Sequence, residues 1–314
     1  MLSGPINNAA LSAVKKQSEV VLKPSKPTWL KTKLRSGPNF QDLKSIVADN
    51  QVHTVCQEAK CPNISECWER RAASIMILGD TCTRSCAFCA VKTGRPPSAV
   101  DQDEPRRTAE AVKKMGLHHC VITSVDRDDL DDGGAFIWAA TIRQIHAEVP
   151  GCSIEVLTPD FQGKPEDIKI VLDAQPEIMS HNLETVERLH RRIRPQAQYQ
   201  RSLDVLRQSV QAGLQTKTSI MVGIGETQTE VLELMDVIRE TGCQIFSLGQ
   251  YLQPTKAHEP VHRFVHPDEF TGYKEYGLKI GFNHVESGPL VRSSYHADEQ
   301  VLQNEILNPN NRTQ

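Results

Sequence analysis

The sequence has no apolar run that approaches the roughly 18 residues of a membrane span, and it has no signal-peptide core. Its formal net charge is only −3, which argues against a protein that binds nucleic acid by neutralising phosphates. With 314 residues, 39% of them hydrophobic, it can bury a large core in one barrel-sized domain with additions. We therefore expect a soluble enzyme that contacts neither membranes nor nucleic acid.

A disulfide framework is not expected either. The chain is long and has nine cysteines, an odd number, whereas disulfide frameworks are typical of small secreted domains. No arginine precedes Arg35, so residues 1–25 do not resemble an Arg-rich organelle transit peptide and are expected to form a flexible arm. Reduced thiols belong to a reducing compartment, which predicts a cytoplasmic protein.

Six of the cysteines form two groups of three. Their spacings are C-x4-C-x5-C and C-x3-C-x2-C, at Cys56, Cys61 and Cys67 and at Cys82, Cys86 and Cys89. A closed zinc site takes four ligands, whereas three thiolates suit a cubane iron–sulfur cluster with one iron left for another ligand. We therefore predict two metal centres. One four-cysteine zinc site with two spare thiols is the alternative.

The residues around both groups resemble a known family. C-x3-C-x2-C with the aromatic Phe88 before the last cysteine is similar to the signature of the radical S-adenosylmethionine (SAM) enzymes. The stretch from Thr54 to Trp68 resembles the auxiliary-cluster motif of the lipoyl synthases, and Met76 to Cys82 and Arg292 to Ala297 resemble other motifs of that family. The resemblance extends from about Lys26 to Ala297. Departures are Ser180, where the family usually has Asn, and Ile137 with Trp138, where it usually has His and Phe.

The resemblance implies a reaction, its cofactors and its partners. Two sulfur atoms would be inserted at the sixth and eighth carbons of an octanoyl chain on a carrier-protein lysine. The cofactors would be two 4Fe–4S clusters and two SAM molecules per lipoyl group, because only a cofactor-derived radical can take hydrogen from such carbons. The expected partners are octanoylated carrier domains (the glycine cleavage H protein and 2-oxoacid dehydrogenase acyltransferase subunits), an electron donor such as ferredoxin or flavodoxin, and cluster-assembly proteins.

The resemblance also implies roles for individual residues. Cys82, Cys86 and Cys89 would bind the cluster that cleaves SAM, while Cys56, Cys61 and Cys67, with Ser294 as fourth ligand, would bind a cluster that donates sulfur. SAM contacts are expected at Phe88, Gly133, Gly134, Glu155, Asn182, Arg194 and Gly225. Ordinary explanations remain open for several of these: a turn for the Gly-Gly pair, an exposed strand position for Glu155, and helix-end cations for Arg191, Arg192 and Arg194.

The chain from Ser74 onward alternates short apolar runs with amphipathic helical stretches, which is the βα pattern of a parallel sheet. Strands are predicted at 74–79, 119–124, 153–158, 178–182, 217–224 and 245–251. Helices are predicted at 40–48, 108–115, 136–148, 165–174, 184–190, 201–212, 229–240 and 267–280. Six βα units fit an open, partial (β/α)6 TIM-like barrel of the radical SAM type, with N- and C-terminal extensions.

Four regions follow from this pattern: the arm at 1–25, an extension with the first cysteine group at 26–73, the partial barrel at 74–286, and a C-terminal segment at 287–314 that closes the active site. The barrel's chemistry is expected where strands end, at Cys82, Asp126, Thr158, Asn182, Glu184 and Gln250 among others. One rival function is another two-cluster radical SAM enzyme such as a methylthiotransferase. The other is an inactive zinc adaptor, which a colourless anaerobic preparation would indicate.

Overall fold

The computed structural model describes residues 25–32, 37–97 and 99–297. The arm expected at 1–25 therefore lies outside the described residues except for its last residue, as does the C-terminal segment beyond residue 297. None of the described helices is long and apolar enough to cross a membrane.

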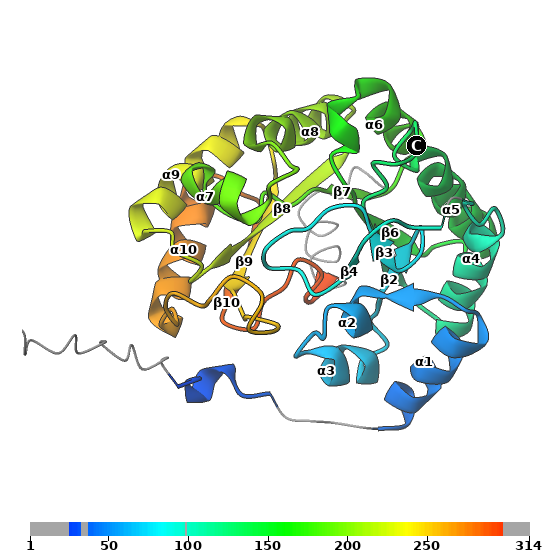
Figure 1. Cartoon of the computed structure of the whole chain (residues 1–314), viewed down its shortest axis with the longest axis horizontal. Coiled ribbons are helices and arrows are strands. Elements are labelled where there is room, and N and C mark those ends of the chain that lie inside the picture. Colours follow the sequence, from blue (N-terminus) through cyan, green and yellow to red (C-terminus); the bar gives the residue numbers. More distant parts are fainter. Residues whose placement is uncertain (1–24, 33–36, 98, 298–314) are drawn as a thin grey trace, which may run out of the picture.

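An eight-stranded sheet forms the centre of the molecule, and its strands follow one another in chain order. The strands are β1 (His53–Thr54), β2 (Ser74–Ile77), β5 (His119–Ser124), β6 (Ser153–Leu157), β7 (Ile178–Ser180), β8 (Gln215–Val222), β9 (Ile245–Gln250) and β10 (His284–Gly288). Strands β2 to β10 pair in parallel, whereas β1 pairs antiparallel to β2. In the described part of the chain β1 and β10 are the two edges, so the barrel is open (Figure 1).

Helices surround the outside of this sheet and cover its convex face (Figure 1). They are α4 (Glu104–Met115), α5 (Ala135–Glu148), α6 (Pro165–Leu172), α8 (Tyr199–Gln211), α9 (Gln228–Glu240) and α10 (Pro267–Lys279), with the short α7 (Glu187–Ile193) between β7 and α8. Local sequence sets several of the helix ends. Thr227 and Glu230 form a capping box at the start of α9, and Gly116 ends α4 in the left-handed conformation.

The six predicted βα units are confirmed, with shifts of a few residues at their ends. The prediction missed β10, which adds a seventh parallel strand beyond β9. Only Val285 of its five residues is buried, so β10 lacks the apolar run that marked the other strands. All four residues of β2 are buried, as expected for a central parallel strand.

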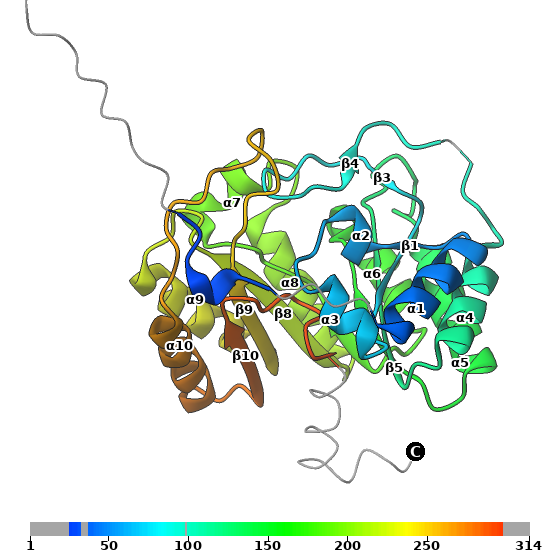
Figure 2. The same cartoon turned by 90° about the horizontal axis from the view of Figure 1, so that it is seen from below.

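The N-terminal extension packs across the opening between the two sheet edges (Figures 1 and 2). It contains η1 (Thr28–Leu30), α1 (Pro38–Asp49), α2 (Val55–Glu58) and α3 (Ile64–Glu69). The predicted helix at 40–48 is confirmed as part of α1, which buries Leu43 and Val47. The ring of Phe40 lies 5.3 Å from that of the buried Trp68, and this contact joins α1 to α3. The extension thereby brings the first cysteine group to the barrel.

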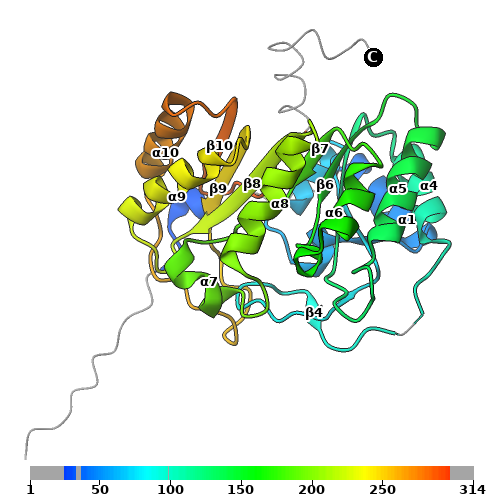
Figure 3. The same ribbon diagram turned by 90° about the horizontal axis from the view of Figure 1, so that it is seen from above.

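Loops at the carboxyl ends of the strands extend from one side of the barrel. Figure 3 shows α7 and β4 (Lys92–Thr93) projecting from the same end. β4 pairs there with β3 (Thr81–Cys82). The 3-10 turn η2 (Phe161–Gly163) follows β6. In parallel α/β folds this end of the sheet carries the chemistry.

Candidate functional site

A cavity of about 510 Å³ opens among the loops at this end of the barrel. It lies within the roughly 300–1,000 Å³ typical of small-molecule sites. Cysteines of both groups line it: Cys82, Cys86 and Cys89 from the barrel loop, and Cys56 and Cys61 from the extension. Two motifs that are separate in the sequence therefore face one space.

The residues that were predicted to lie together at the strand ends line this cavity. The cavity wall includes Asp126, Thr158, Asn182, Glu184 and Gln250. Glu184 has φ +69°, a conformation that is uncommon for a non-glycine residue. Its backbone is pinned on both sides, because its amide donates to the Ser219 carbonyl over 3.1 Å and its carbonyl accepts from the Met221 amide over 2.9 Å. Sequence alone carries no signal of this strained turn.

Three neighbouring loops hold the C-x3-C-x2-C loop. The Thr83 amide donates to the Asp126 carbonyl over 3.0 Å, and the Ala87 amide donates to the Ile193 carbonyl over 2.8 Å. The Ala87 carbonyl accepts from the Glu259 amide over 2.9 Å. Partners after β5, at the end of α7 and after β9 thus hold the loop at Thr83 and Ala87.

His258 contacts the last cysteine of this loop, which no sequence pattern indicated. Its Nε2 lies 2.9 Å from the carbonyl oxygen of Cys89, and its Nδ1 lies 2.8 Å from Thr255 Oγ1. His258 belongs to no metal-ligand spacing in the sequence, so no local pattern marks it. It fixes the last cysteine of the loop through the backbone.

Backbone amides point at the first sulfur of this loop. The Arg84 and Asp126 amides lie 3.4 and 3.3 Å from Cys82 Sγ. Burial raises the pKa of the Cys82 and Cys86 thiols to about 12 and that of Cys89 to about 11. Thiolates at these positions therefore need a bound cation to compensate the cost of burial, and amides aimed at sulfur are typical of iron–sulfur sites.

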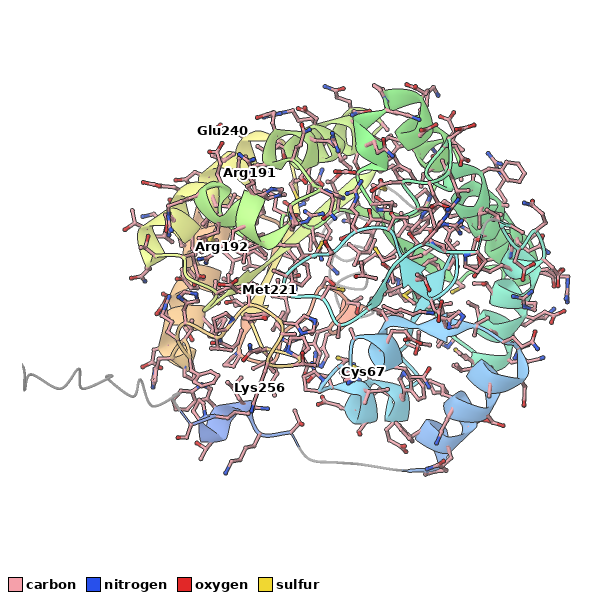
Figure 4. The ribbon with its side chains drawn as sticks, in the orientation of Figure 1. Cys67, Arg191, Arg192, Met221, Glu240 and Lys256 are labelled. Carbon is pink, nitrogen blue, oxygen red and sulfur yellow. The ribbon has the colours of Figure 1, made fainter. Side chains whose placement is uncertain are left out.

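The second cysteine group lines a smaller cavity that adjoins the first. Cys56 lies on α2 and Cys67 on α3 (Figure 4), with Cys61 in the connecting turn. Ser294 lines both cavities, and Ser74 Oγ donates to Ser294 Oγ over 2.8 Å. Burial raises the pKa of Cys56 to about 11 and of Cys67 to about 12.

The C-terminal segment is tied to this group by two further contacts. Asn63 Nδ2 donates to the Leu290 carbonyl over 2.7 Å, and the Tyr295 hydroxyl donates to Glu66 Oε1 over 3.3 Å. Both link the turn and helix that carry Cys61 and Cys67 to residues more than 200 positions later. The Arg292-to-Ala297 motif is thereby placed beside the auxiliary-cluster motif.

The donor sets fit clusters. Within the described ranges, no three His, Cys, Asp or Glu side chains are arranged to hold one metal ion. In a cubane cluster each thiolate binds a different iron, so the three sulfurs of a group surround a volume and need not converge on a point. Both cysteine groups line a cavity in this way, and each supplies soft sulfur donors suited to iron–sulfur chemistry.

Of the seven expected SAM contacts, three lie in the cavity wall: Phe88, Asn182 and Arg194. Arg194 is 8% exposed, and its Nη1 donates to the Asn182 carbonyl over 2.7 Å. Arg191 and Arg192 are exposed on the last turn of α7 (Figure 4). The two interpretations of the arginine-rich segment therefore apply to different residues: helix-end cations for Arg191 and Arg192, and a cavity-facing cation for Arg194.

The other four, Gly133, Gly134, Glu155 and Gly225, are not among the residues that line the cavity, and their contact with SAM stays a prediction. Gly133 and Gly134 have φ of +60° and +88° and form the turn before α5. A Cβ on Gly134 would come within 2.5 Å of Leu78 Cδ1. The backbone of this close turn requires glycine, so a turn is sufficient to explain the Gly-Gly pair.

Glu155 is neither an exposed strand residue nor a cavity residue. Its carboxylate lies in the barrel interior, where Lys217 Nζ donates to Oε2 over 2.9 Å, and both side chains are at most 1% exposed. Gly225, with φ +123°, belongs to a turn whose amides donate to the Glu226 carboxylate. The sequence pattern gave no sign that a charged pair would lie inside the barrel.

Breaking this buried pair is expected to destabilise the fold strongly. Lys217→Met removes the ammonium beside this buried carboxylate, while His119 Nε2 stays 3.9 Å from the same oxygen. Losing one partner of such a buried pair costs about 3–5 kcal/mol. The double variant Glu155→Leu with Lys217→Met removes both charges and should recover most of that loss. Urea unfolding of the anaerobic protein followed by circular dichroism measures both. Equal midpoints for Lys217→Met and the unmodified chain would contradict this interpretation.

Known proteins share this architecture and these motifs. The sequence model of the radical SAM superfamily matches residues 76–238, and that of the N-terminal domain of lipoyl synthase matches residues 4–61. A lipoyl synthase of Rubrobacter xylanophilus is 56% identical over 88% of this chain and 86% of that protein. The lipoyl synthase of Halalkalibacterium halodurans is 52% identical over 90% of this chain and 93% of that protein.

Solved structures agree in fold at low identity. SuiB of Streptococcus suis bound to S-adenosylmethionine has a TM-score of 0.56 at 13% identity, over 73% of this chain and 54% of that one. Methylornithine synthase (PylB) has a TM-score of 0.53 at 12% identity, over 85% of this chain and 92% of that one. These likenesses support the partial-barrel fold and nothing finer.

Proposed function

The chain belongs to the lipoyl synthase family of the radical SAM superfamily, and from this premise we propose that it inserts sulfur at the sixth and eighth carbons of a protein-bound octanoyl-lysine. One observation carries the proposal: a single cavity is lined by cysteines of both groups. A reaction that needs one centre to activate carbon and another to supply sulfur requires both to face the same substrate.

Membership of the superfamily implies a 4Fe–4S cluster and SAM. We assign that cluster to Cys82, Cys86 and Cys89. We assign a second cluster to Cys56, Cys61 and Cys67, with Ser294 as the fourth ligand. When bound, the first supplies the electron that cleaves SAM, and the second supplies the two sulfur atoms.

The cavity wall offers apolar side chains that suit an acyl chain. They include Val55, Met76, Ile220, Met221, Leu252 and Val291. Each buried methylene contributes about 0.8 kcal/mol, so an eight-carbon chain is held mainly by these side chains. They also exclude water, which protects a reactive carbon from quenching.

The polar part of the wall suits SAM. Arg194 is buried at the cavity wall next to the Cys86 loop, where a guanidinium can bind a carboxylate in two-point fashion. Its bond to the Asn182 carbonyl fixes its orientation before the ligand arrives. Phe88 adds an aromatic surface beside Cys89. We propose that these three residues position SAM.

The substrate is delivered by another protein. A lysine-linked octanoyl chain enters the cavity from an octanoylated carrier domain such as the glycine cleavage H protein or a 2-oxoacid dehydrogenase acyltransferase subunit. Ferredoxin or flavodoxin would supply the electron. Cluster-assembly proteins would restore the sulfur-donating centre after each turnover, because its sulfur is consumed.

Mass spectrometry of an octanoylated carrier peptide tests the function. The peptide is incubated anaerobically with the protein, SAM and a reductant. We expect a product in which two hydrogens have been replaced by two sulfur atoms, together with 5′-deoxyadenosine. Deoxyadenosine without any thiolated peptide would point to a different radical SAM reaction and would overturn the proposal.

A further inference from the structure

We propose that Arg84, inside the C-x3-C-x2-C loop, is a positioning residue for the cluster at Cys82, Cys86 and Cys89, an inference that rests on the proposed function. Its guanidinium joins the loop to carboxylates from two other loops and balances the negative charge beside Cys82. Arg84 therefore sets both how firmly the cluster is held and how readily it accepts an electron.

The guanidinium contacts three carboxylates at once. Asp128 accepts two hydrogen bonds from the guanidinium in a bidentate pair, from Nε to Oδ2 over 2.7 Å and from Nη2 to Oδ1 over 2.8 Å. Nη2 also lies 2.6 Å from Asp160 Oδ1, and Nη1 lies 3.3 Å from Asp126 Oδ1. The Arg84 side chain is only 2% exposed. Such a planar fork cannot be replaced by lysine without loss of contacts.

These contacts join three loops that are far apart in the sequence. Arg84 follows β3, Asp126 and Asp128 follow β5, and Asp160 follows β6. Side-chain hydrogen bonds of Thr83 and Ser85 also hold this part of the loop, but they carry no ion pair. Arg84 thus fixes its middle, between the first and second cysteines, against two strands of the barrel.

The charge at Cys82 gives Arg84 a second role. Asp126 Oδ2 lies 3.6 Å from Cys82 Sγ, where a thiol can donate its proton to the carboxylate. Once that sulfur binds iron it has no proton, and two negative groups face each other. Nη1 of Arg84 forms an ion pair with the other oxygen of the Asp126 carboxylate, and this positive charge offsets the repulsion.

Asp160 holds the Arg84 guanidinium in place as a second ionised partner. It is fully buried, and burial raises the pKa of its carboxyl, but the hydrogen bond and charge of Arg84 outweigh burial and hold the pKa at about 2. Arg201 lies 3.3 Å from its other oxygen and does not touch the cysteine loop. Arg201 is therefore a matched control, because it pairs with Asp160 as Arg84 does but does not connect Asp160 to the cysteine loop.

The test is an electron-paramagnetic-resonance redox titration of the cluster. It is done in a Cys56, Cys61 and Cys67→Ala background, so that one cluster contributes. Reduction adds negative charge, and losing a nearby cation disfavours the reduced form. Arg84→Gln should lower the ratio of reduced to oxidised cluster at a fixed potential about tenfold, which is a 59 mV lower midpoint for one electron. Iron release to a chelator should be at least about tenfold faster.

Two further variants decide the interpretation. Asp126→Asn removes a negative charge near Cys82 and should raise the midpoint, the opposite sign to Arg84→Gln. Arg201→Gln should leave the midpoint and iron release close to those of the background protein. An unchanged midpoint with unchanged iron release in Arg84→Gln overturns the proposal, as does an equal shift in Arg201→Gln.

If Arg84→Gln loses its cluster during purification, the sign of the Asp126→Asn shift decides, and a midpoint that is unchanged or lower overturns the proposal. None of these readouts needs sulfur insertion. Failure of the proposed function, which is an unmodified chain that makes no thiolated peptide, is therefore distinct from failure of this inference.

Discussion

Alanine at Cys82, Cys86 and Cys89 is expected to abolish SAM cleavage. These thiols are the proposed ligands of the cluster that reduces SAM, on a loop that three neighbouring segments hold in place. Without them that cluster would have no protein ligands. Deoxyadenosine, measured by chromatography after anaerobic incubation with reductant, should fall to background. Iron content should fall by about four per chain, as for one cubane cluster.

The matched change in the other group should separate the two functions. Alanine at Cys56, Cys61 and Cys67 leaves the barrel loop intact, so SAM cleavage should remain measurable while thiolated product disappears. Iron should again fall by about four per chain. Installation of both sulfurs by this variant would show that the extension's cysteines do not hold the sulfur donor.

Ser294→Cys is expected to keep the auxiliary cluster but stall sulfur insertion. Ser294 lines the cavity of Cys56, Cys61 and Cys67, and no fourth cysteine lines that cavity. A serine oxygen is a harder donor than a thiolate and less suited to iron in a sulfide cluster. It can therefore leave when its iron is extracted, whereas a cysteine in its place would hold that iron. Iron quantitation and product mass spectrometry measure the two effects.

Ser294→Ala should have a different outcome, a labile cluster that loses iron. The neighbouring Ser293 provides the control, because it lines the large cavity but not the smaller one. Ser293→Ala should therefore retain iron in the second cluster. Normal double thiolation by Ser294→Cys, or loss of the cluster in Ser293→Ala instead, would move the ligand assignment to another residue.

Local patterns in the sequence were sufficient for the parallel strands and their helices. β5 (HCVITS) and β9 (IFSLGQ) are apolar runs bounded by turns, and α4 and α8 show helical spacing, so each could be recognised without its neighbours. Because parallel strands carry their chemistry at one end, the same patterns placed Asp126, Thr158 and Asn182 at one mouth.

Features that depend on distant residues could not be predicted in this way. Glu155 reads as a polar strand position until Lys217, 62 residues later, is seen to face it. Arg84 occupies an unspecified position of the C-x3-C spacing, and its role was not predicted because its three carboxylate partners come from other loops. The strand β10 has one buried residue, and its identity depends on pairing with β9. In each case the signal is a tertiary contact.

The motif around Gly133 and Gly134 has a backbone explanation beside the one that the resemblance implies. Their positive φ and the contact with Leu78 explain why glycine is required there, independently of any ligand. Asp132 also accepts from the Gly134 and Phe136 amides over 2.9 Å, so the turn is satisfied from within the chain. A motif shared with a family can therefore reflect backbone geometry as well as binding.

Isotope tracing of the transferred sulfur tests the central claim most directly. The protein is reconstituted with heavy-isotope sulfide and freed of unbound sulfide. It is then given octanoylated carrier peptide, SAM and reductant for a single turnover in which all other sulfur is of natural isotopic composition. We expect thiolated peptide with two heavy sulfur atoms, and none from the Cys56, Cys61 and Cys67→Ala variant. Product that carries only natural-abundance sulfur would contradict the assignment of the second cysteine group as the sulfur donor.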